Sequence, residues 1–356
     1  MLHALAATRT YTLDTADRLF SDVSTSASLA AAERGAFDTA AWTKIVEAGL
    51  TFALTPEEAG GFGLPIVEGL EIARSVGEHL LPLPLCETML AAWALGTHGL
   101  AIPDGPLTVA AASIKDPLCL ARDGDGWRLT GTARRIPWAE QATAIAVLAE
   151  ADDGARLTRV ERAQLTTQAG QNLAMEPRAA ISFDMRVPAK CVAAPGALTA
   201  LSFRAAGAVM RCLQMAGALT RLTDMTATYA QDRVQFGKSL SKFQAIQHNI
   251  AILATQSAAA SSCASLAAEA FAGGMKIDAI AAAKARIGEA AGIAAPIAHQ
   301  IHGAMGFTYE HQLHFVTKRL LSWREEFGNE REWQQFLGAR VRQQGADGAW
   351  SYLSAI

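Results

Sequence analysis

The sequence predicts a multi-domain α+β protein in which a helical domain, a β-domain and a helical bundle follow one another. Apolar residues recur at helical spacing in roughly the first hundred residues and again after residue 196, whereas the residues between them alternate as strands do. Hydrophobic residues make up 51% of the 356, which is enough to fill more than one core. We therefore place the domains at residues 1–104, 105–195 and 196–356.

The first domain is expected to consist of short helices joined by tight loops. Asp38 can cap a helix that carries Trp42 and Ile45 on one face and ends at Gly49. Residues 56–63 contain a proline and three glycines, a composition typical of an irregular turn. A second helical stripe over residues 66–76 is interrupted by Pro82 and Pro84.

The middle domain shows strand patterns and is expected to form a small β-barrel. Residues 107–109 and 144–148 are short apolar runs, and residues 181–187 alternate strictly between apolar and polar side chains. The sequence Asp-Gly-Asp-Gly at residues 123–126 predicts a hairpin between two further strands.

The last domain is predicted to be a four-helix bundle. Apolar stripes with helical spacing cover residues 209–219, 243–253 and 287–301. The third stripe is rich in alanine, and such small side chains let helices approach closely.

Composition argues against several classes of partner and location. A formal net charge of −3 and a pI near 6.3 give no electrostatic reason to bind nucleic acid or an anionic membrane. No apolar run approaches the roughly 20 residues needed to span a bilayer, so no membrane-spanning segment is expected. The five cysteines are scattered, so we expect free thiols, no metal site, and, since the start lacks the features of a secretory signal, a cytoplasmic protein.

Two clusters attract a chemical interpretation. Arg233, Phe236 and Gly237 follow a long helical pattern, with Gly237 as its expected stop, and Gln244 opens the next helix. An arginine fork and an amide at such a corner suit a diphosphate, although an exposed arginine beside a helix end explains the residues equally well. The second cluster, residues 300–306, contains His302, Gly303 and Gly306 and is by itself compatible with an ordinary helix end.

Taken together and in order, these motifs resemble the acyl-CoA dehydrogenase family of flavoproteins. The resemblance rests on Pro-Glu-Glu-Ala-Gly-Gly at residues 56–61, Trp-Arg-Leu-Thr-Gly-Thr-Ala at residues 127–133, the eleven-residue step from Arg233 to Gln244, and Gln-Ile-His-Gly-Ala at residues 300–304. The resemblance covers nearly the whole chain. Several motifs that match in the same order are much more specific than any single motif.

The resemblance implies a cofactor and an assembly. It implies FAD, held across a subunit boundary in a homo- or hetero-tetramer that is a dimer of dimers. It further implies an acyl-CoA substrate, proton abstraction by a glutamate, hydride transfer to the flavin, and an electron-transfer flavoprotein as acceptor. The residues that it assigns to FAD are Arg233, Phe236, Gln244, Gln300, His302, Gly303 and Ala304.

The catalytic base is the point at which the sequence departs from the family. The family's commonest base is a glutamate directly before a glycine, and here Phe327 precedes Gly328. A shift of one residue offers Glu326 as the base, although Glu326 equally fits a solvated charged run. The expected flavin-ring motifs are also missing from residues 110–117, and Pro137 and Trp138 stand near the place of a hydroxyl residue.

Three hypotheses follow from this pattern. In the first, the chain is an active acyl-CoA dehydrogenase that forms the α,β-double bond with Glu326 as base. In the second, it is a non-catalytic subunit that completes the FAD site of a heteromeric α2β2 dehydrogenase, as in bacterial steroid side-chain degradation, whose subunits are also short. The third, oxygen activation on the same fold, has no specific support in the sequence.

Overall fold

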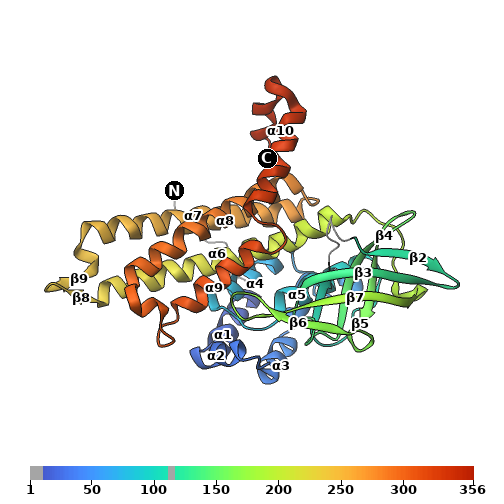
Figure 1. Ribbon diagram of the computed structural model, residues 1–356, viewed down its shortest axis with the longest axis horizontal. Coiled ribbons are helices and arrows are strands. Elements are labelled where there is room, and N and C mark those ends of the chain that lie inside the picture. Colours follow the sequence, from blue (N-terminus) through green and yellow to red (C-terminus); the bar gives the residue numbers. More distant parts are fainter. Residues whose placement is uncertain (1–10, 111–116) are drawn as a thin grey trace. The chain divides into compact units, whose positions relative to one another are not determined.

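The computed structural model describes residues 11–110 and 117–356 (Figure 1). The chain divides into two compact units: unit 1 extends to Ser75 and resumes over Leu81–Arg204, and unit 2 combines Val76–Leu80 with Ala205–Ile356. Apart from residues 76–80, the first two predicted domains fall within unit 1, and their division into two remains a prediction. Most of the stretch that lacks the flavin-ring motifs, residues 111–116, lies outside the described residues.

Short helices precede the sheet in the sequence, as predicted. Asp38 accepts a hydrogen bond from the Ala41 amide at 2.9 Å and caps α3, while Gly49 follows this helix with a φ of 72°. Both predicted ends of this helix are therefore confirmed. The α-helices are α1 (Tyr11–Val23), α2 (Ser26–Glu33), α3 (Thr39–Glu47), α4 (Ile66–His79) and α5 (Leu85–Thr97), and the 3₁₀ turns are η1 (Leu50–Phe52) and η2 (Glu57–Ala59).

The glycine pair at residues 60–61 closes a tight turn, and its two members have different roles. Gly60 has a φ of 93° and open space around it, whereas a Cβ added to Gly61 would lie 1.8 Å from the Thr55 carbonyl oxygen. We expect Gly61→Ala to lower the free energy of unfolding by about 3 kcal/mol, because backbone must move to admit the methyl group. Gly60→Ala, the matched control, is expected to cost about 1–2 kcal/mol through its left-handed backbone alone. Chemical denaturation of both variants measures this difference, and equal losses would contradict the steric explanation.

The strands form one seven-stranded sheet that is a half-barrel. Its pairing path runs β1-β4-β2-β3-β7-β6, with β5 paired to β4. The predicted β-barrel is borne out only as a half-barrel, because within the described residues neither β1 nor β5 pairs with β6. The strands are β1 (Leu107–Ala110), β2 (Cys119–Asp123), β3 (Gly126–Pro137), β4 (Ala144–Ala151), β5 (Gly154–Glu161), β6 (Thr167–Gln171) and β7 (Pro177–Pro188); η3 (Arg162–Gln164) and η4 (Ala189–Cys191) are 3₁₀ turns.

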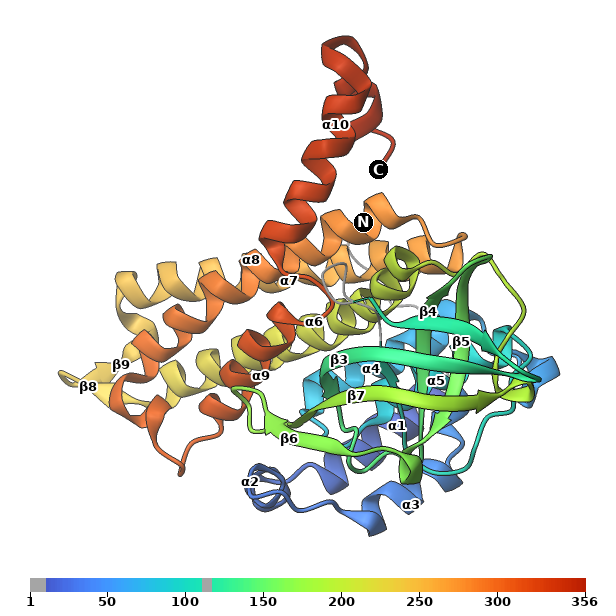
Figure 2. The same cartoon turned by 45° about the vertical axis from the view of Figure 1, so that its right-hand side comes forward.

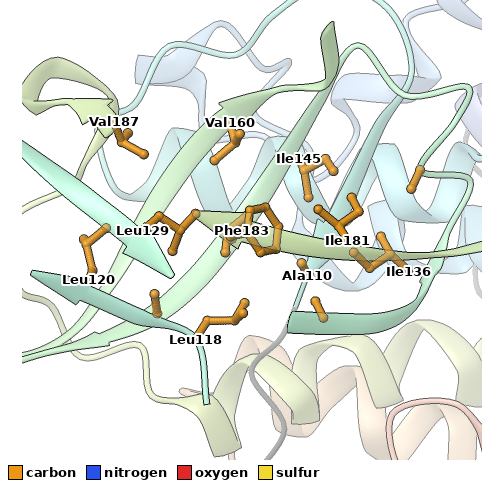
Figure 3. Packing of buried hydrophobic residues seen from close by; sticks show 14 of the residues in the cluster. Ala110, Leu118, Leu120, Leu129, Ile136, Ile145, Val160, Ile181, Phe183 and Val187 are labelled. Carbon is orange, nitrogen blue, oxygen red and sulfur yellow. The ribbon is translucent and has the colours of Figure 1, made fainter. Parts of the chain in front are cut away.

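Alternation along β7 builds the core of the sheet (Figure 3). Ile181, Phe183 and Val187 are buried, whereas Ser182 and Asp184 between them are exposed. The hairpin between β2 and β3 turns at residues 124–125, with Asp123 paired to Gly126. The alternating strand and the hairpin are both confirmed.

Unit 2 is helical, as predicted. Helices α6, α7 and α8 lie side by side as three long rods, and a small hairpin of β8 and β9 joins α6 to α7 at one end of them (Figures 1 and 2). The elements are α6 (Ala200–Asp232), β8 (Val234–Gln235), β9 (Lys238–Ser239), η5 (Leu240–Lys242), α7 (Gln244–Ala272), α8 (Ile277–His302), η6 (Gly303–Phe307), α9 (Leu313–Glu325) and α10 (Glu330–Leu353). Helix α10 is additional to the four predicted helices and points away from the other helices of the unit (Figure 2).

Helix α7 contradicts the expectation that no segment is apolar enough to span a membrane. By length and composition alone α7 qualifies, with a mean hydropathy of 1.4 over its most apolar window, of which only 28% is buried. A single helix of this kind is weak support for a membrane span. The apolar segment was missed in the sequence because small polar residues interrupt its alanines. The absence of a membrane partner stays a prediction. Over the part of the chain that the structure describes, most of the apolar window of α7 is therefore left uncovered.

Candidate functional site

The α6–α7 hairpin carries the first group of predicted site residues. Helix α6 ends at Asp232, so Gly237 is not a helix stop as predicted; it forms the hairpin turn together with Phe236, and both residues have positive φ (77° and 52°). This two-residue turn twists in the sense that antiparallel strands require. Arg233 lies directly after α6 and Gln244 is the first residue of α7, and both side chains are exposed.

The end of α8 brings the second group to the same place. Tyr229, in the last turn of α6, stacks on the His302 ring with centroids 4.3 Å apart, and its hydroxyl donates to the His302 carbonyl oxygen at 3.3 Å. Gln300, Gly303 and Ala304 around this contact are exposed. The structure therefore assembles Arg233, Phe236, Gln244, Gln300, His302, Gly303 and Ala304 at one end of unit 2, which we call the hairpin end.

Gly303 and His302 contribute to the hairpin end in different ways. Gly303 adopts φ 60° and ψ −142°, a conformation nearly restricted to glycine, and has open space around its Cα. The His302 side chain is only 3% exposed and points into the helices, where its Nδ1 lies 2.8 Å from the Ala298 carbonyl oxygen. Burial lowers the pKa of His302 to about 4, so the imidazole is neutral near pH 7 and brings no charge to this end.

The candidate base Glu326 lies in a second location, at the end of α9. Its carboxylate accepts hydrogen bonds from Arg211 of α6, whose Nε and Nη2 both lie within 2.8 Å of Oε2. Arg211 is 1% exposed and Glu326 is 13% exposed, so they form a nearly buried ion pair. Sequence reasoning missed Arg211, whose only signal was a lone arginine inside an apolar helical stripe.

Neighbouring side chains fix the backbone around Glu326. Phe327 and Gly328 both have positive φ (54° and 100°), and the Trp333 indole donates to the Phe327 carbonyl oxygen at 3.1 Å. Lys284 of α8 donates to the Gly328 carbonyl oxygen at 2.9 Å, and complete burial lowers the pKa of its ammonium to about 8. We call residues 326–328 the 326–328 turn.

Phe327 occupies a slot opened by a glycine. A Cβ added to Gly207 of α6 would lie 2.2 Å from the Phe327 ring, so only glycine fits there while the ring stays in place. The Arg211 guanidinium carbon lies 5.7 Å from the centre of the same ring. The residue that the resemblance, anchored on Gly328, assigns to the family's catalytic position is thus an aromatic side chain packed against α6.

The hairpin end and the 326–328 turn are separate sites. Both contact α6, but Arg211 lies in the first half of that helix and Arg233 directly after it. At about 1.5 Å of rise per residue, α6 separates the two arginines by about 33 Å. The structure therefore groups the predicted FAD residues with one another and not with Glu326.

Unit 1 contains the remaining positions that the sequence singled out. Trp138 is buried, has a φ of 53° and meets Phe37 edge-on, with ring centroids 6.4 Å apart. Near Phe37 lies an apolar cavity of about 230 Å³, lined by residues of α2 and α3 and by the segment from Leu81 to Leu83. Its polar side chains are already engaged, since Asp38 caps α3 and the Ser28 hydroxyl donates to the Val23 carbonyl oxygen.

Thiols and metal ligands complete the survey of reactive groups. All five cysteines are free, and burial raises the pKa of the Cys212 thiol to about 12, which keeps it protonated and unreactive. Over residues 11–110 and 117–356, no three histidine, cysteine or acidic side chains are arranged to hold a metal ion.

Comparisons of the sequence with protein families and with curated proteins both found acyl-CoA dehydrogenases. A family profile described as "Acyl-CoA dehydrogenase, C-terminal domain" matches residues 196–330. The "Acyl-CoA dehydrogenase FadE27" of Mycobacterium tuberculosis is 31% identical over 60% of this chain, and the match spans 62% of that relative's length.

Two solved structures share the fold over most of the chain. The structure titled "Tcur3481-Tcur3483 steroid ACAD G363A variant" has a TM-score of 0.84 and 26% identity, covering 94% of this chain and 98% of that one. The "ChsE4-ChsE5 complex from Mycobacterium tuberculosis" has a TM-score of 0.84 and 24% identity over the same shares of the two chains.

Proposed function

Because the chain belongs to the acyl-CoA dehydrogenase family, we propose that it is the FAD-completing subunit of a heteromeric acyl-CoA dehydrogenase. In this proposal the hairpin end holds the adenosine-diphosphate part of an FAD that is docked mainly on a second chain. The second chain supplies the base that removes the α-proton of the acyl-CoA. The observation that carries the proposal is that Glu326, in the 326–328 turn, forms a nearly buried ion pair with Arg211.

The geometry of that turn opposes proton abstraction by this chain. A base must reach the α-carbon of a bound thioester with a free lone pair. Two nitrogens of Arg211 contact Oε2 of Glu326, and this permanently charged guanidinium stabilises the carboxylate anion. The neighbouring Phe327 cannot accept a proton and is packed against Gly207.

The hairpin end, in contrast, has the chemistry that a dinucleotide requires. The Arg233 side chain is exposed, and none of the described residues forms an ion pair with it. It offers a planar fork of donors to two phosphate oxygens, while the amides of Gln244 and Gln300 can both donate and accept. Gly303 lets backbone approach a ligand without a side chain in the way. The residues present therefore fit FAD, which when bound would accept the hydride that leaves the β-carbon of the acyl group.

Exposed apolar surface supports assembly with a second chain. Phe236 is 92% exposed, and Phe307 and Tyr309, just after the 300–304 segment, are 71% and 77% exposed. The mostly uncovered face of α7 lies in the same unit. Aromatic side chains in such positions are typical of interfaces. We propose that a homologous chain covers these surfaces in a tetramer that is a dimer of dimers.

Substrate, electron acceptor and location follow from the family and from the relatives' names. We propose an acyl-CoA of the steroid type, because a structure of 26% identity is titled a steroid ACAD. An electron-transfer flavoprotein as acceptor and a cytoplasmic location belong to the same proposal.

The test of the proposal asks which chain supplies the base. In the flavin-containing assembly, Glu326→Gln is expected to leave anaerobic bleaching of the flavin by acyl-CoA within about twofold of the unmodified rate, whereas loss of a true general base costs about 10²–10⁴-fold. Glu325→Gln, at the exposed neighbouring carboxylate, is the matched control.

The competing function has a distinct signature in the same experiment. If Glu326 is the base of an active dehydrogenase, its glutamine variant loses bleaching while flavin content and subunit composition stay normal. That outcome would overturn the proposal. A chain that binds FAD and is reduced by acyl-CoA without any partner would overturn it as well.

A further inference from the structure

Four histidines gather beneath the hairpin end, and the proposed function does not use them as a group. His299 and His302 belong to α8, His311 to the loop before α9, and His314 to α9. The rings of His302 and His311 meet with centroids 4.6 Å apart, and the His314 Nδ1 lies 2.8 Å from the His311 carbonyl oxygen. We call these residues the histidine cluster.

The hydrogen bonds of His302 determine where its proton lies. Its Nδ1 faces the Ala298 carbonyl oxygen, which can only accept, so Nδ1 carries the hydrogen. Its Nε2 is buried and has no hydrogen-bond partner among the described residues. A second proton on this ring would sit on Nε2, which is buried and has no acceptor among the described residues.

Tyr229 connects His302 to Arg233. Its ring lies 24° from parallel to the imidazole, and its carbonyl oxygen accepts the Arg233 amide hydrogen at 2.9 Å. Its hydroxyl donates to the carbonyl oxygen of His302, the residue before Gly303. Tyr229 thus joins the end of α6 to the end of α8 by both stacking and hydrogen bonding.

Building on the proposed FAD site, we propose that the neutral Tyr229–His302 stack positions the 300–304 segment for the dinucleotide, and that proton uptake by His302 releases it. His302 is a positioning residue here, because its side chain points inward and it acts through the backbone of Gly303. The consequence is an FAD site that holds its cofactor at neutral pH and loosens as the pH falls.

Burial and the neighbouring histidines oppose a second proton on His302. Burial lowers the pKa of His302 most, the hydrogen bond with the Ala298 carbonyl oxygen raises it, and His311 of the loop and His299 of the same helix lower it further. Burial lowers the pKa of His299 and of His311, and His314 of α9 lowers both further. Tyr229 of α6 presents an uncharged ring. Charged side chains on the adjoining segments are the exposed Glu310, Lys318, which lies over Tyr309, and the exposed Asp232 and Arg233 at the end of α6.

Linkage gives the direction and the limit of the effect. In the closed arrangement, in which the Tyr229–His302 stack is formed, the pKa of His302 falls from 6.5 to about 4. The closed arrangement therefore binds fewer protons than the open one, in which the stack is broken. Closure is therefore unaffected above pH 6.5 and is disfavoured progressively as the pH falls towards 4. Between pH 7.5 and pH 5 this one group can weaken FAD binding by at most about 30-fold.

The experiment measures the dissociation constant of FAD for the assembly at pH 7.5 and pH 5, with far-UV circular dichroism to verify that the fold is intact. We expect a ratio between about threefold and 30-fold for the unmodified protein. His302→Phe keeps an aromatic ring against Tyr229 but cannot take up a proton. Its ratio is expected to fall below threefold, whatever its affinity at pH 7.5. The control is His98→Gln, on unit 1, which should keep the unmodified ratio.

The possible results separate this inference from the function on which it rests. An assembly that binds no FAD at either pH refutes the proposed function. FAD binding with a ratio below threefold in the unmodified protein refutes the positioning role alone. An equal ratio in the unmodified protein and in His302→Phe also refutes the positioning role. The same holds if both proteins lose their fold at pH 5.

Discussion

FAD is expected to bind about 100-fold more weakly after replacement of Arg233 by alanine. The guanidinium is the single permanent positive charge among the residues assigned to the hairpin end, and the ligand proposed to face it is a diphosphate. Removing one partner of a desolvated, hydrogen-bonded charge pair costs about 2–5 kcal/mol, and about 3 kcal/mol corresponds to 100-fold. The measurement is the flavin retained per chain, and the dissociation constant, in the purified flavin-containing assembly.

Two further variants show whether geometry or charge is responsible. Arg233→Lys keeps the charge but loses the planar fork, so it is expected to recover only part of the affinity. Arg342→Ala, which removes an exposed arginine of α10 in the same unit, should leave flavin content unchanged. Unaltered flavin binding in Arg233→Ala would remove Arg233 from the site and with it the main support for the hairpin end.

The largest effect on stability is expected from Arg211→Met. The substitution approximately conserves volume but leaves the Glu326 carboxylate without its cation in a nearly buried position. Breaking a buried ion pair from one side costs about 3–5 kcal/mol, because the remaining charge loses its closest counter-charge in a nearly buried position. Hydrogen exchange of α9 and of the first turns of α10 reports this loss, because both lie next to the 326–328 turn.

A double variant separates loss of the pair from loss of packing. In Arg211→Met with Glu326→Gln the orphan charge is gone, so most of the stability should return, with a coupling of about 2 kcal/mol or more. A loss below about 1 kcal/mol in the single variant would show that water reaches Glu326. That result would also make Glu326 a more credible base.

Local patterns predicted most of the secondary structure. Alternation over residues 181–187 identified β7, Asp38 and Gly49 marked both ends of α3, and Gln244 opened α7, because caps and periodicities act over a few residues. That the sheet remains a half-barrel was not predictable from such local patterns. It depends on which distant strands pair, and β6, with four exposed residues, carries no apolar signal at all.

The candidate sites were predictable to different degrees for the same reason. The residues of the hairpin end belong to short motifs, so their sequence spacing identified them before their contacts were known. The partner of Glu326 is 115 residues away on α6, and one sequence carries no record of that proximity. His302 was assigned to the cofactor from its motif, but only the contacts with Ala298 and Tyr229 show that its ring faces inward.

The uncovered face of α7 also has a consequence for the cell. A subunit that relies on another chain to cover its apolar helix gains stability from that chain by mass action, so its folded lifetime depends on the supply of its partner. Copies made in excess would remain with this helix exposed and be removed by chaperones and proteases. In the proposed assembly, the synthesis of the two chains must therefore be matched in amount and in time.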